Sequence, residues 1–276
     1  MTLFTTLILA AMFGPAGFVH TDADIAWVAE GPFCEPETVL PLPDDTLLVS
    51  NVCGFAEKGS GFVSKLSPDG EILEARFIPG LDAPLGMALH KSNLYVIDSN
   101  RVKIFDTAEF ILWETIELET SVANDIAVGE HGDIYVTDSA GHKVLHRSTD
   151  GQQAVLSEGF EFRGANGIEV KGTDLYVGGA RLWKVDLESR AVETLGPEWL
   201  VDIDGIEFEV DGTLQLTLVA GPLVRYRDDN SFQILSGEGI SSANHGYSAS
   251  LGLALVPTGY DNTVIAIRVP DFPLKP

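Results

Sequence analysis

Six positions in this 276-residue chain recur in one phase of a repeat and could do chemistry together. Each opens a short apolar run, and they are spaced 48, 39, 42, 38 and 41 residues apart: Glu37, Leu85, Asn124, Asn166, Asp204 and His245. Four of the six side chains carry oxygen donors. Two carboxylates and two amide carbonyls, with no cysteine among them, suit Ca²⁺ far better than Zn²⁺ or Cu²⁺. The pattern predicts a site for Ca²⁺, or for another divalent cation, formed by Glu37, Asn124, Asn166 and Asp204.

A single Asn or Asp before glycine is more often a turn or a strand entry than a metal ligand. Asp69, Asp150 and Asp211 precede glycine where hairpin turns are expected. Four oxygen donors recurring in one phase are less easily explained as turns. A polar channel filled by water is the alternative to the metal site.

The elements that must position these residues are short β-strands. About ten residues after each of the six positions comes a strong β-rich run, and no amphipathic helical period is sustained. These runs are 47–50, 94–97, 134–137, 175–177, 214–217 and 253–256. Six units of about 40 residues, each a set of antiparallel strands, predict an all-β, six-bladed β-propeller.

The two ends of the chain are expected to close this ring. The run Ile25–Val28 can supply the strand that the last unit lacks after Val264–Ile267, which removes an exposed sheet edge. We expect residues 21–276 to form one propeller domain. The innermost strands of the blades line the central channel, so the six positions should meet at one mouth.

Two side chains at this mouth can accept a proton from water. Asp204 and His245 both qualify by position, and His245 has the more suitable unperturbed pKa. An aspartate that also binds a metal is a weaker base, so the assignment stays open, and His245 can equally be a residue that fills the channel. Four more side chains are expected near the same mouth: Asn51, Asp98, Asp125 and Asp138. A structural role for them is at least as well supported as a role in supporting the metal ligands.

Four short phrases carry a family resemblance. They are Pro36-Glu37-Thr38-Val39, Ala123-Asn124-Asp125-Ile126, Ala165-Asn166-Gly167-Ile168 and Asp204-Gly205. They resemble the gluconolactonase and senescence-marker-protein (regucalcin) propellers, and more distantly the paraoxonases, over residues 30–270.

The resemblance implies a Ca²⁺ held by Glu37, Asn166 and Asp204, with Asn124 as a ligand or, beside Asp125, a substrate contact. It also implies hydrolysis of lactones or related esters, with Asp204 as the proton acceptor. One departure stands out. Sugar-lactone members place an arginine just before the Asn-Asp pair, where this chain has 121–123, Ser-Val-Ala. The departure argues against an aldonolactone substrate.

The charge balance limits the partners. Seventeen Lys and Arg face 41 Asp and Glu, for a formal net charge of −24. Such a chain can hardly form the basic patches that nucleic acids or anionic membranes require. No segment is long enough to span a bilayer. We expect a monomer that acts on a neutral small molecule.

The N-terminal residues favour export. Residues 1–20 contain no charged side chain, and the apolar run 3–13 is followed by Gly-Pro-Ala-Gly. This predicts a signal peptide and a periplasmic or secreted protein, although the n-region lacks Lys and Arg and an uncleaved first strand is the alternative. Cys34 and Cys53 flank a predicted hairpin turn at 43–45, so a disulfide is geometrically plausible; two buried thiols are the alternative.

Two functions follow from the sequence. The first is an exported, calcium-dependent hydrolase of a lactone or small ester. The second is a non-catalytic, calcium-stabilised propeller that binds a ligand or a protein, because repeat scaffolds host unrelated functions.

Overall fold

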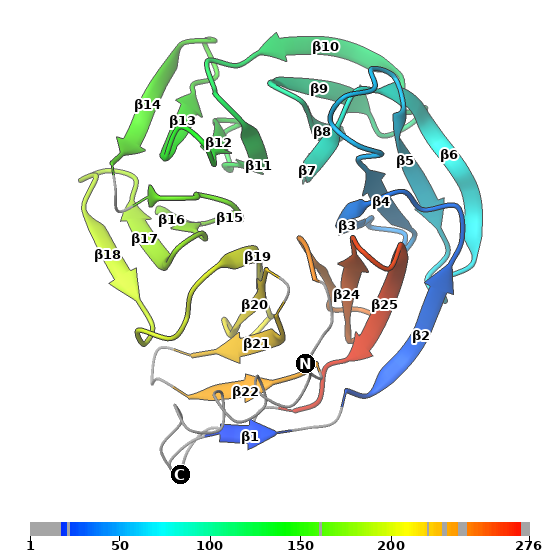
Figure 1. Cartoon of the computed structure of the whole chain (residues 1–276). Helices are drawn as coiled ribbons and strands as arrows, with labels where there is room; N and C mark the ends of the chain where they lie inside the picture. The colour runs from blue at the N-terminus through cyan, green and yellow to red at the C-terminus, as the bar shows by residue number, and fades with distance from the viewer. Residues whose placement is uncertain are drawn as a thin grey trace.

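The chain folds as a ring of β-sheets around a central channel (Figure 1). The computed structural model describes residues 18–20, 23–159, 162–219, 221–227, 231–236 and 242–271. Across these ranges six antiparallel sheets follow one another around the channel. This confirms the predicted all-β, six-bladed propeller. The described residues include no helix long and apolar enough to cross a membrane.

Each blade has four strands that run from the channel to the outside. The innermost strands are β3 (Pro36–Pro41), β7 (Pro84–His90), β11 (Ala123–Val128), β15 (Ile168–Lys171), β19 (Ile203–Phe208) and β23 (Gly246–Ser248). The second strands are β4 (Leu47–Asn51), β8 (Asn93–Asp98), β12 (Ile134–Asp138), β16 (Asp174–Val177), β20 (Leu214–Leu218) and β24 (Leu253–Thr258). The third strands are β5 (Gly61–Leu66), β9 (Arg101–Asp106), β13 (Lys143–Arg147), β17 (Leu182–Asp186), β21 (Leu223–Tyr226) and β25 (Thr263–Arg268). The outer strands are β6 (Ile72–Leu81), β10 (Leu112–Glu117), β14 (Gln153–Glu158), β18 (Val192–Leu195), β22 (Phe232–Ile234) and β2 (Ile25–Glu30).

The ring closes as the sequence predicts. Strand β2, from the N-terminal part of the chain, pairs antiparallel with β25 and becomes the outer strand of the last blade. Ile25 lies opposite Ile267, and Val28 lies opposite Ile265. The last blade is therefore built from both ends of the chain, as Figure 1 shows.

The predicted signal peptide, residues 1–20, lies mostly outside the described residues. Its last three residues, Phe18–His20, form β1. This strand pairs parallel with β22 and adds a fifth strand to the blade of β19 to β22. Cleavage of the leader stays a prediction.

The hydrophobic core lies between the blades. Leu47 and Val49 of the first blade, for example, pack with Leu255 and Val264 of the last. A blade buried on both faces needs apolar side chains on both sides of its second strand, which is why these strands are continuous apolar runs rather than alternating ones. The interlocked blades form a rigid frame for the residues at the channel.

Candidate metal centre and channel

Three of the four candidate ligands, Glu37, Asn124 and Asp204, stand on bulges of the innermost strands, and Asn166 lies just before β15. In four of these strands the pairing register shifts at the same place, so that two inner residues oppose one on the second strand. Glu37, Leu85, Asn124 and Asp204 are each the first residue of such a bulge. A bulge re-aims a side chain, and here it does so at equivalent positions around the channel.

Gly86 and Gly167, each the second residue of a repeated unit, lie where neighbouring inner strands approach closely. A Cβ on Gly167 would collide with the carbonyl oxygen of Asp204, and a Cβ on Gly86 with the carboxylate of Asp125. Only glycine allows this approach without displacing the next blade. Gly86 and Gly167 are therefore spacers between blades rather than turn residues.

Hydroxyl groups on the second strands hold the bulges in place. The backbone amides of Thr38, Asp125 and Gly205 donate to Ser50 Oγ (2.9 Å), Thr137 Oγ1 (3.0 Å) and Thr217 Oγ1 (2.7 Å), in that order. Thr137 and Thr217 in turn donate to carbonyl oxygens of the following blade, Asn166 O at 2.6 Å and Ala243 O at 2.8 Å. We did not select these hydroxyls from the sequence, although three of the six β-rich runs end in Ser or Thr.

Three of the four predicted ligands present buried oxygens that lack a partner. Within the described part of the chain, Oδ1 of Asn124, Asn166 and Asp204 is buried and accepts no hydrogen bond. Glu37 uses Oε2 to accept a hydrogen bond from Thr38 Oγ1 at 2.6 Å. Buried acceptors without donors are costly, and a hard cation would satisfy all of them at once. The donor set therefore fits a divalent cation.

The carboxylates alone would not make this site. Among the described residues, no group of three or more His, Cys, Asp or Glu side chains is arranged to hold a metal ion. A cation at the mouth would therefore depend on the amide oxygens of Asn124 and Asn166 as well as on Glu37 and Asp204. Such a mixed set favours Ca²⁺ over Zn²⁺.

The field at this site is strongly negative. Burial raises the pKa of Glu37 from 4.5 to about 7, against the opposing effect of the Thr38 hydrogen bond. Burial also raises the pKa of Asp204 well above its usual range, and the charges of Glu37 and Asp125 raise it further. These acids repel one another across the channel, and a bound cation would relieve that repulsion.

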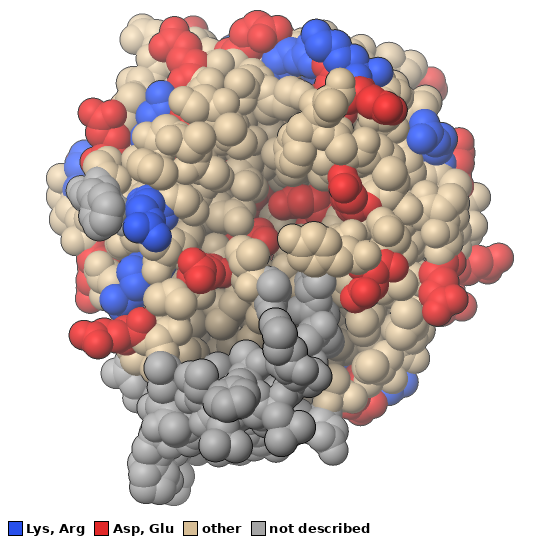
Figure 2. Space-filling model, in the orientation of Figure 1, with Lys and Arg blue, Asp and Glu red and all other residues tan. Residues whose placement is uncertain are grey.

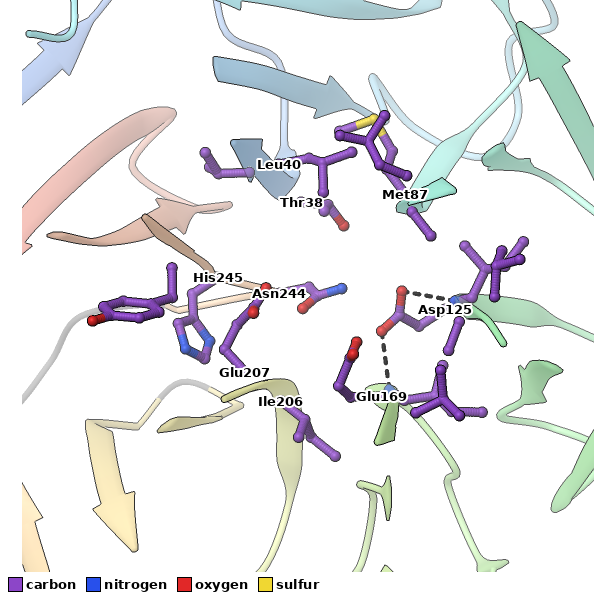
Figure 3. A pocket seen from close by; sticks show the side chains of 18 of the residues that line it. Thr38, Leu40, Met87, Asp125, Glu169, Ile206, Glu207, Asn244 and His245 are labelled. Atoms are coloured by element: carbon purple, nitrogen blue, oxygen red, sulfur yellow. Dashed lines mark hydrogen bonds between the residues drawn. The ribbon is translucent and has the colours of Figure 1, made fainter. Parts of the chain in front are cut away.

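Asp125 holds two blades together. Its Oδ1 accepts from the amide of Ile126 at 2.8 Å, and its Oδ2 accepts from the amide of Ile168 at 3.0 Å, on the next inner strand (Figure 3). Even so, burial and the charge of Glu37 raise its pKa well above normal. The predicted role of Asp125 as a substrate contact stays a prediction, whereas its contacts are those of a positioning residue.

His245 is buried, with 1% of its surface exposed, and neither ring nitrogen has a hydrogen-bond partner in the described structure. Burial lowers its pKa to about 3, so the ring is neutral at physiological pH. Its Nδ1 lies close to the backbone of Gly205, beside Asp204. Both candidate bases therefore belong to neighbouring blades at the same level of the channel.

A cavity of about 270 Å³ lies inside the channel, on the side of the candidate ligands that faces away from the mouth. Figure 3 shows the carboxylates of Asp125, Glu169 and Glu207 directed into it. Burial raises the pKa of Glu169 to about 7, and burial together with the charges of Glu169 and Asp125 raises that of Glu207 well above normal. Sequence reasoning missed these two glutamates. The signal was the repeated Asn/Asp-Gly-Ile-Glu of 166–169 and 204–207.

A second cavity, of about 310 Å³, opens at the mouth. Glu37, Leu85 and Asp204 form part of its lining, together with the exposed aromatic side chains Phe55 and Tyr260. The centre thus divides an outer, largely apolar cavity from an inner, acidic one. Figure 2 shows acidic side chains in the hollow at the middle of one face, with Lys and Arg toward the periphery.

The other acids near the mouth have structural partners. Asp98 Oδ1 accepts from the amides of residues 82 and 83, at 2.7 and 2.8 Å. Asp138 accepts from the amide of residue 121 with Oδ2 and from that of residue 122 with Oδ1, at 2.8 and 2.9 Å. Asn51 Oδ1 accepts from the amide of Cys34 at 3.0 Å. These three side chains fix the loops that lead into the innermost strands.

Cys34 and Cys53 pair as a disulfide in the structure, with their Cα atoms 4.9 Å apart. The amide of Cys53 also donates to the carbonyl of Cys34 at 3.1 Å. The crosslink fastens the start of the loop between β4 and β5 next to β3. This loop carries Phe55 to the mouth cavity.

Comparison with solved structures identifies other proteins with this fold. The chain is similar to selenomethionine-substituted virginiamycin B lyase from Staphylococcus aureus, with a TM-score of 0.62 and 11% identity over 85% of this chain and 95% of that one. A catalytically inactive variant of virginiamycin B lyase from the same organism, with quinupristin, gives a TM-score of 0.60 and 13% identity, over 85% and 95% of the two chains. A streptogramin B lyase gives 0.61 and 12%, over 88% and 97%. No protein-family model and no curated protein matches the sequence. At these identities the similarity establishes the fold.

Proposed function

We propose that this protein is an exported, calcium-dependent hydrolase that acts on a lactone or small ester. The observation that carries the proposal is the set of buried, unpartnered oxygens on Asn124, Asn166 and Asp204, completed by Glu37 at the end of the channel. The resemblance of the surrounding phrases to the gluconolactonase propellers supports the same conclusion. The solved lyases support it in a general way, since they are enzymes that share this fold.

The chain's own residues suit this reaction. When bound, a divalent cation supplies a Lewis acid that polarises the carbonyl of a lactone or ester. Glu37 and Asp204 provide two negative charges to hold it, and Asn124 and Asn166 provide neutral oxygens that add no repulsion. The open cavity lined by Glu37 and Asp204 gives a substrate access to these two side chains.

Asp204 is the better candidate for the base that takes a proton from the attacking water. Its pKa is raised by burial, whereas burial lowers the pKa of His245 to about 3. A bound cation would lower the pKa of both groups, and His245 would stay neutral. The proton that Asp204 accepts is the one that the leaving alkoxide oxygen needs when the acyl C–O bond breaks. We therefore assign the proton transfer to Asp204 and a space-filling, neutral role to His245.

Export is supported by the uncharged N-terminal segment and by the pairing of Cys34 with Cys53, since structural disulfides persist in oxidising compartments. The mass of the mature protein from the periplasm or the culture medium tests this part. A mass that still includes residues 1–20 would contradict it.

A panel of lactones and aryl esters, assayed with Ca²⁺ and after chelation, tests the function. We expect turnover that needs Ca²⁺, falls by at least about 100-fold in Asp204→Ala, and survives in His245→Asn. Glu188→Gln removes an exposed acid on a distant turn and serves as the matched control. Turnover that persists after chelation and in Asp204→Ala would overturn the metal mechanism. A Ca²⁺-dependent rise in melting temperature without any turnover would instead support the non-catalytic, calcium-stabilised propeller.

A further inference from the structure

The walls of the mouth cavity are apolar down to the candidate centre. Phe55 comes from the loop between β4 and β5, and Tyr260 from the turn between β24 and β25, on the neighbouring last blade. They are 74% and 86% exposed, and Val219, which also lines the cavity, is 52% exposed. Large apolar side chains gathered at a cavity and left in water mark a binding surface rather than a core.

The polar groups of this wall are largely engaged within the protein. The carboxylate of Glu35 accepts a hydrogen bond from the amide of Gly54 at 2.6 Å. The hydroxyl of Ser242 donates to the carbonyl oxygens of Leu218 and Gly221, at 2.9 and 3.1 Å. No Lys, Arg or His side chain belongs to the described lining. Of the three carboxylates in the lining, Glu37 and Asp204 belong to the candidate centre, and Glu35 has one oxygen engaged as described.

We infer that the substrate of this site is a lactone or ester with a hydrocarbon tail, rather than a polyhydroxylated lactone. The inference rests on the proposed function and names its substrate class. The carbonyl group lies at Glu37 and Asp204, and the tail lies along Phe55, Tyr260 and Val219. A sugar lactone would bury several hydroxyls against walls that offer few free partners, which costs affinity for each one left unpaired.

The size of the cavity sets the scale of the effect. A volume of about 310 Å³ lies at the lower end of the range for small-molecule sites, so it accommodates a small ring and a short tail. Each methylene moved from water into an apolar cavity gains about 0.8 kcal/mol, or about fourfold in kcat/KM when the tail is bound in the transition state. The rise should stop once the tail reaches solvent.

A series of lactones with alkyl tails of increasing length, beside an aldonolactone, tests this inference. We expect kcat/KM to rise about fourfold per methylene and the aldonolactone to be the poorest substrate. Phe55→Ser and Tyr260→Ser should each reduce the rise to about twofold, because the tail then lies against a more polar wall. Trp113→Ser removes an aromatic side chain that is 55% exposed on the outer strand β10 and should leave the rise unchanged.

The outcomes separate this inference from the proposed function. Hydrolysis with no dependence on tail length, or with a preference for the aldonolactone, would overturn the substrate class and leave the hydrolase standing. If no lactone is hydrolysed, binding of unreactive alkyl lactams is measured by calorimetry. Affinity that rises with tail length, and does so less in Phe55→Ser, would then support the ligand class while the hydrolase proposal fails. Absence of both hydrolysis and tail-dependent binding would overturn both.

Discussion

The substitution Glu37→Gln should stabilise the protein in the absence of calcium and remove most of the stabilisation that calcium gives. In the absence of metal, burial raises the pKa of Glu37 from 4.5 to about 7. A carboxyl with a raised pKa contributes its full stability below pH 4.5 and loses it as the pH rises through 7. At pH 8 the ionised, buried Glu37 therefore costs the folded protein up to about 3 kcal/mol.

Glutamine keeps the shape of this side chain and carries no charge. In a chelating buffer at pH 8, Glu37→Gln should raise the free energy of unfolding by up to about 3 kcal/mol, or the melting temperature by roughly 6 to 12 °C. At pH 4.5 the difference should shrink toward zero, because Glu37 is then protonated in the folded protein. Loss of the hydrogen bond with Thr38 would not by itself produce this dependence on pH.

Calcium should narrow the stability difference between the two proteins. At a Ca²⁺ concentration 100 times its Kd, binding stabilises the wild-type fold by about 2.7 kcal/mol. A 100-fold loss of affinity in Glu37→Gln would leave about 0.4 kcal/mol at the same concentration. The variant should therefore be the more stable protein in chelator and show almost no further gain with Ca²⁺.

Urea denaturation at pH 4.5 and pH 8, with chelator and with Ca²⁺, measures all of these quantities. Glu188→Gln, on an exposed turn, controls for the general loss of one negative charge from an acidic protein. A Glu37→Gln protein that is no more stable than wild type in chelator at pH 8 would refute the electrostatic reasoning. One that keeps the full stabilisation by Ca²⁺ would refute the ligand assignment.

Three further predictions concern the frame around the centre. The double substitution of Glu169 and Glu207 by Gln should stabilise the protein by at least about 2 kcal/mol at pH 8 and hardly at all at pH 4.5. Urea denaturation measures both values, and equal effects at the two pH values would contradict the raised pKa values. Reduction of the Cys34–Cys53 disulfide should lower the free energy of unfolding by about 3 kcal/mol, and a protein with both cysteines replaced by Ala should not respond to reductant at all. Thr217→Val should cost about 2 kcal/mol and lower turnover, because the amide of the bulge loses its acceptor, while Thr217→Ser should retain both; a fully active and stable Val variant would disprove this positioning role.

The two cavities lie on opposite sides of the ring of candidate ligands and differ in polarity. Asp204 belongs to the mouth cavity, and Glu207, three residues later on β19, belongs to the inner one. Successive channel-facing residues of one strand thus lie on opposite sides of the candidate centre. When they are ionised, the inner carboxylates add negative potential behind the centre, which favours retention of a divalent cation.

The sequence by itself determined the architecture and the phased positions that open the innermost strands. The repeat of about 40 residues and the apolar second strands predict six blades, because a sheet buried on both faces needs apolar side chains on both sides. The strand at Ile25 closes the ring as predicted, because an unpaired edge in the last blade would otherwise remain. Local patterns record these features, since each depends on hydrophobicity and on chain order.

Only the tertiary structure decided how the side chains are aimed and which of their atoms remain free. Asn124 and Asp125 are neighbours in sequence, yet one presents an unpartnered oxygen and the other accepts two backbone amides from different blades. That difference arises from the bulge on β11 and from the close approach of β15, which no local pattern encodes. The division into an apolar mouth and an acidic interior, with Glu169 and Glu207 on the inner side, likewise depends on contacts between blades about 40 residues apart in the chain.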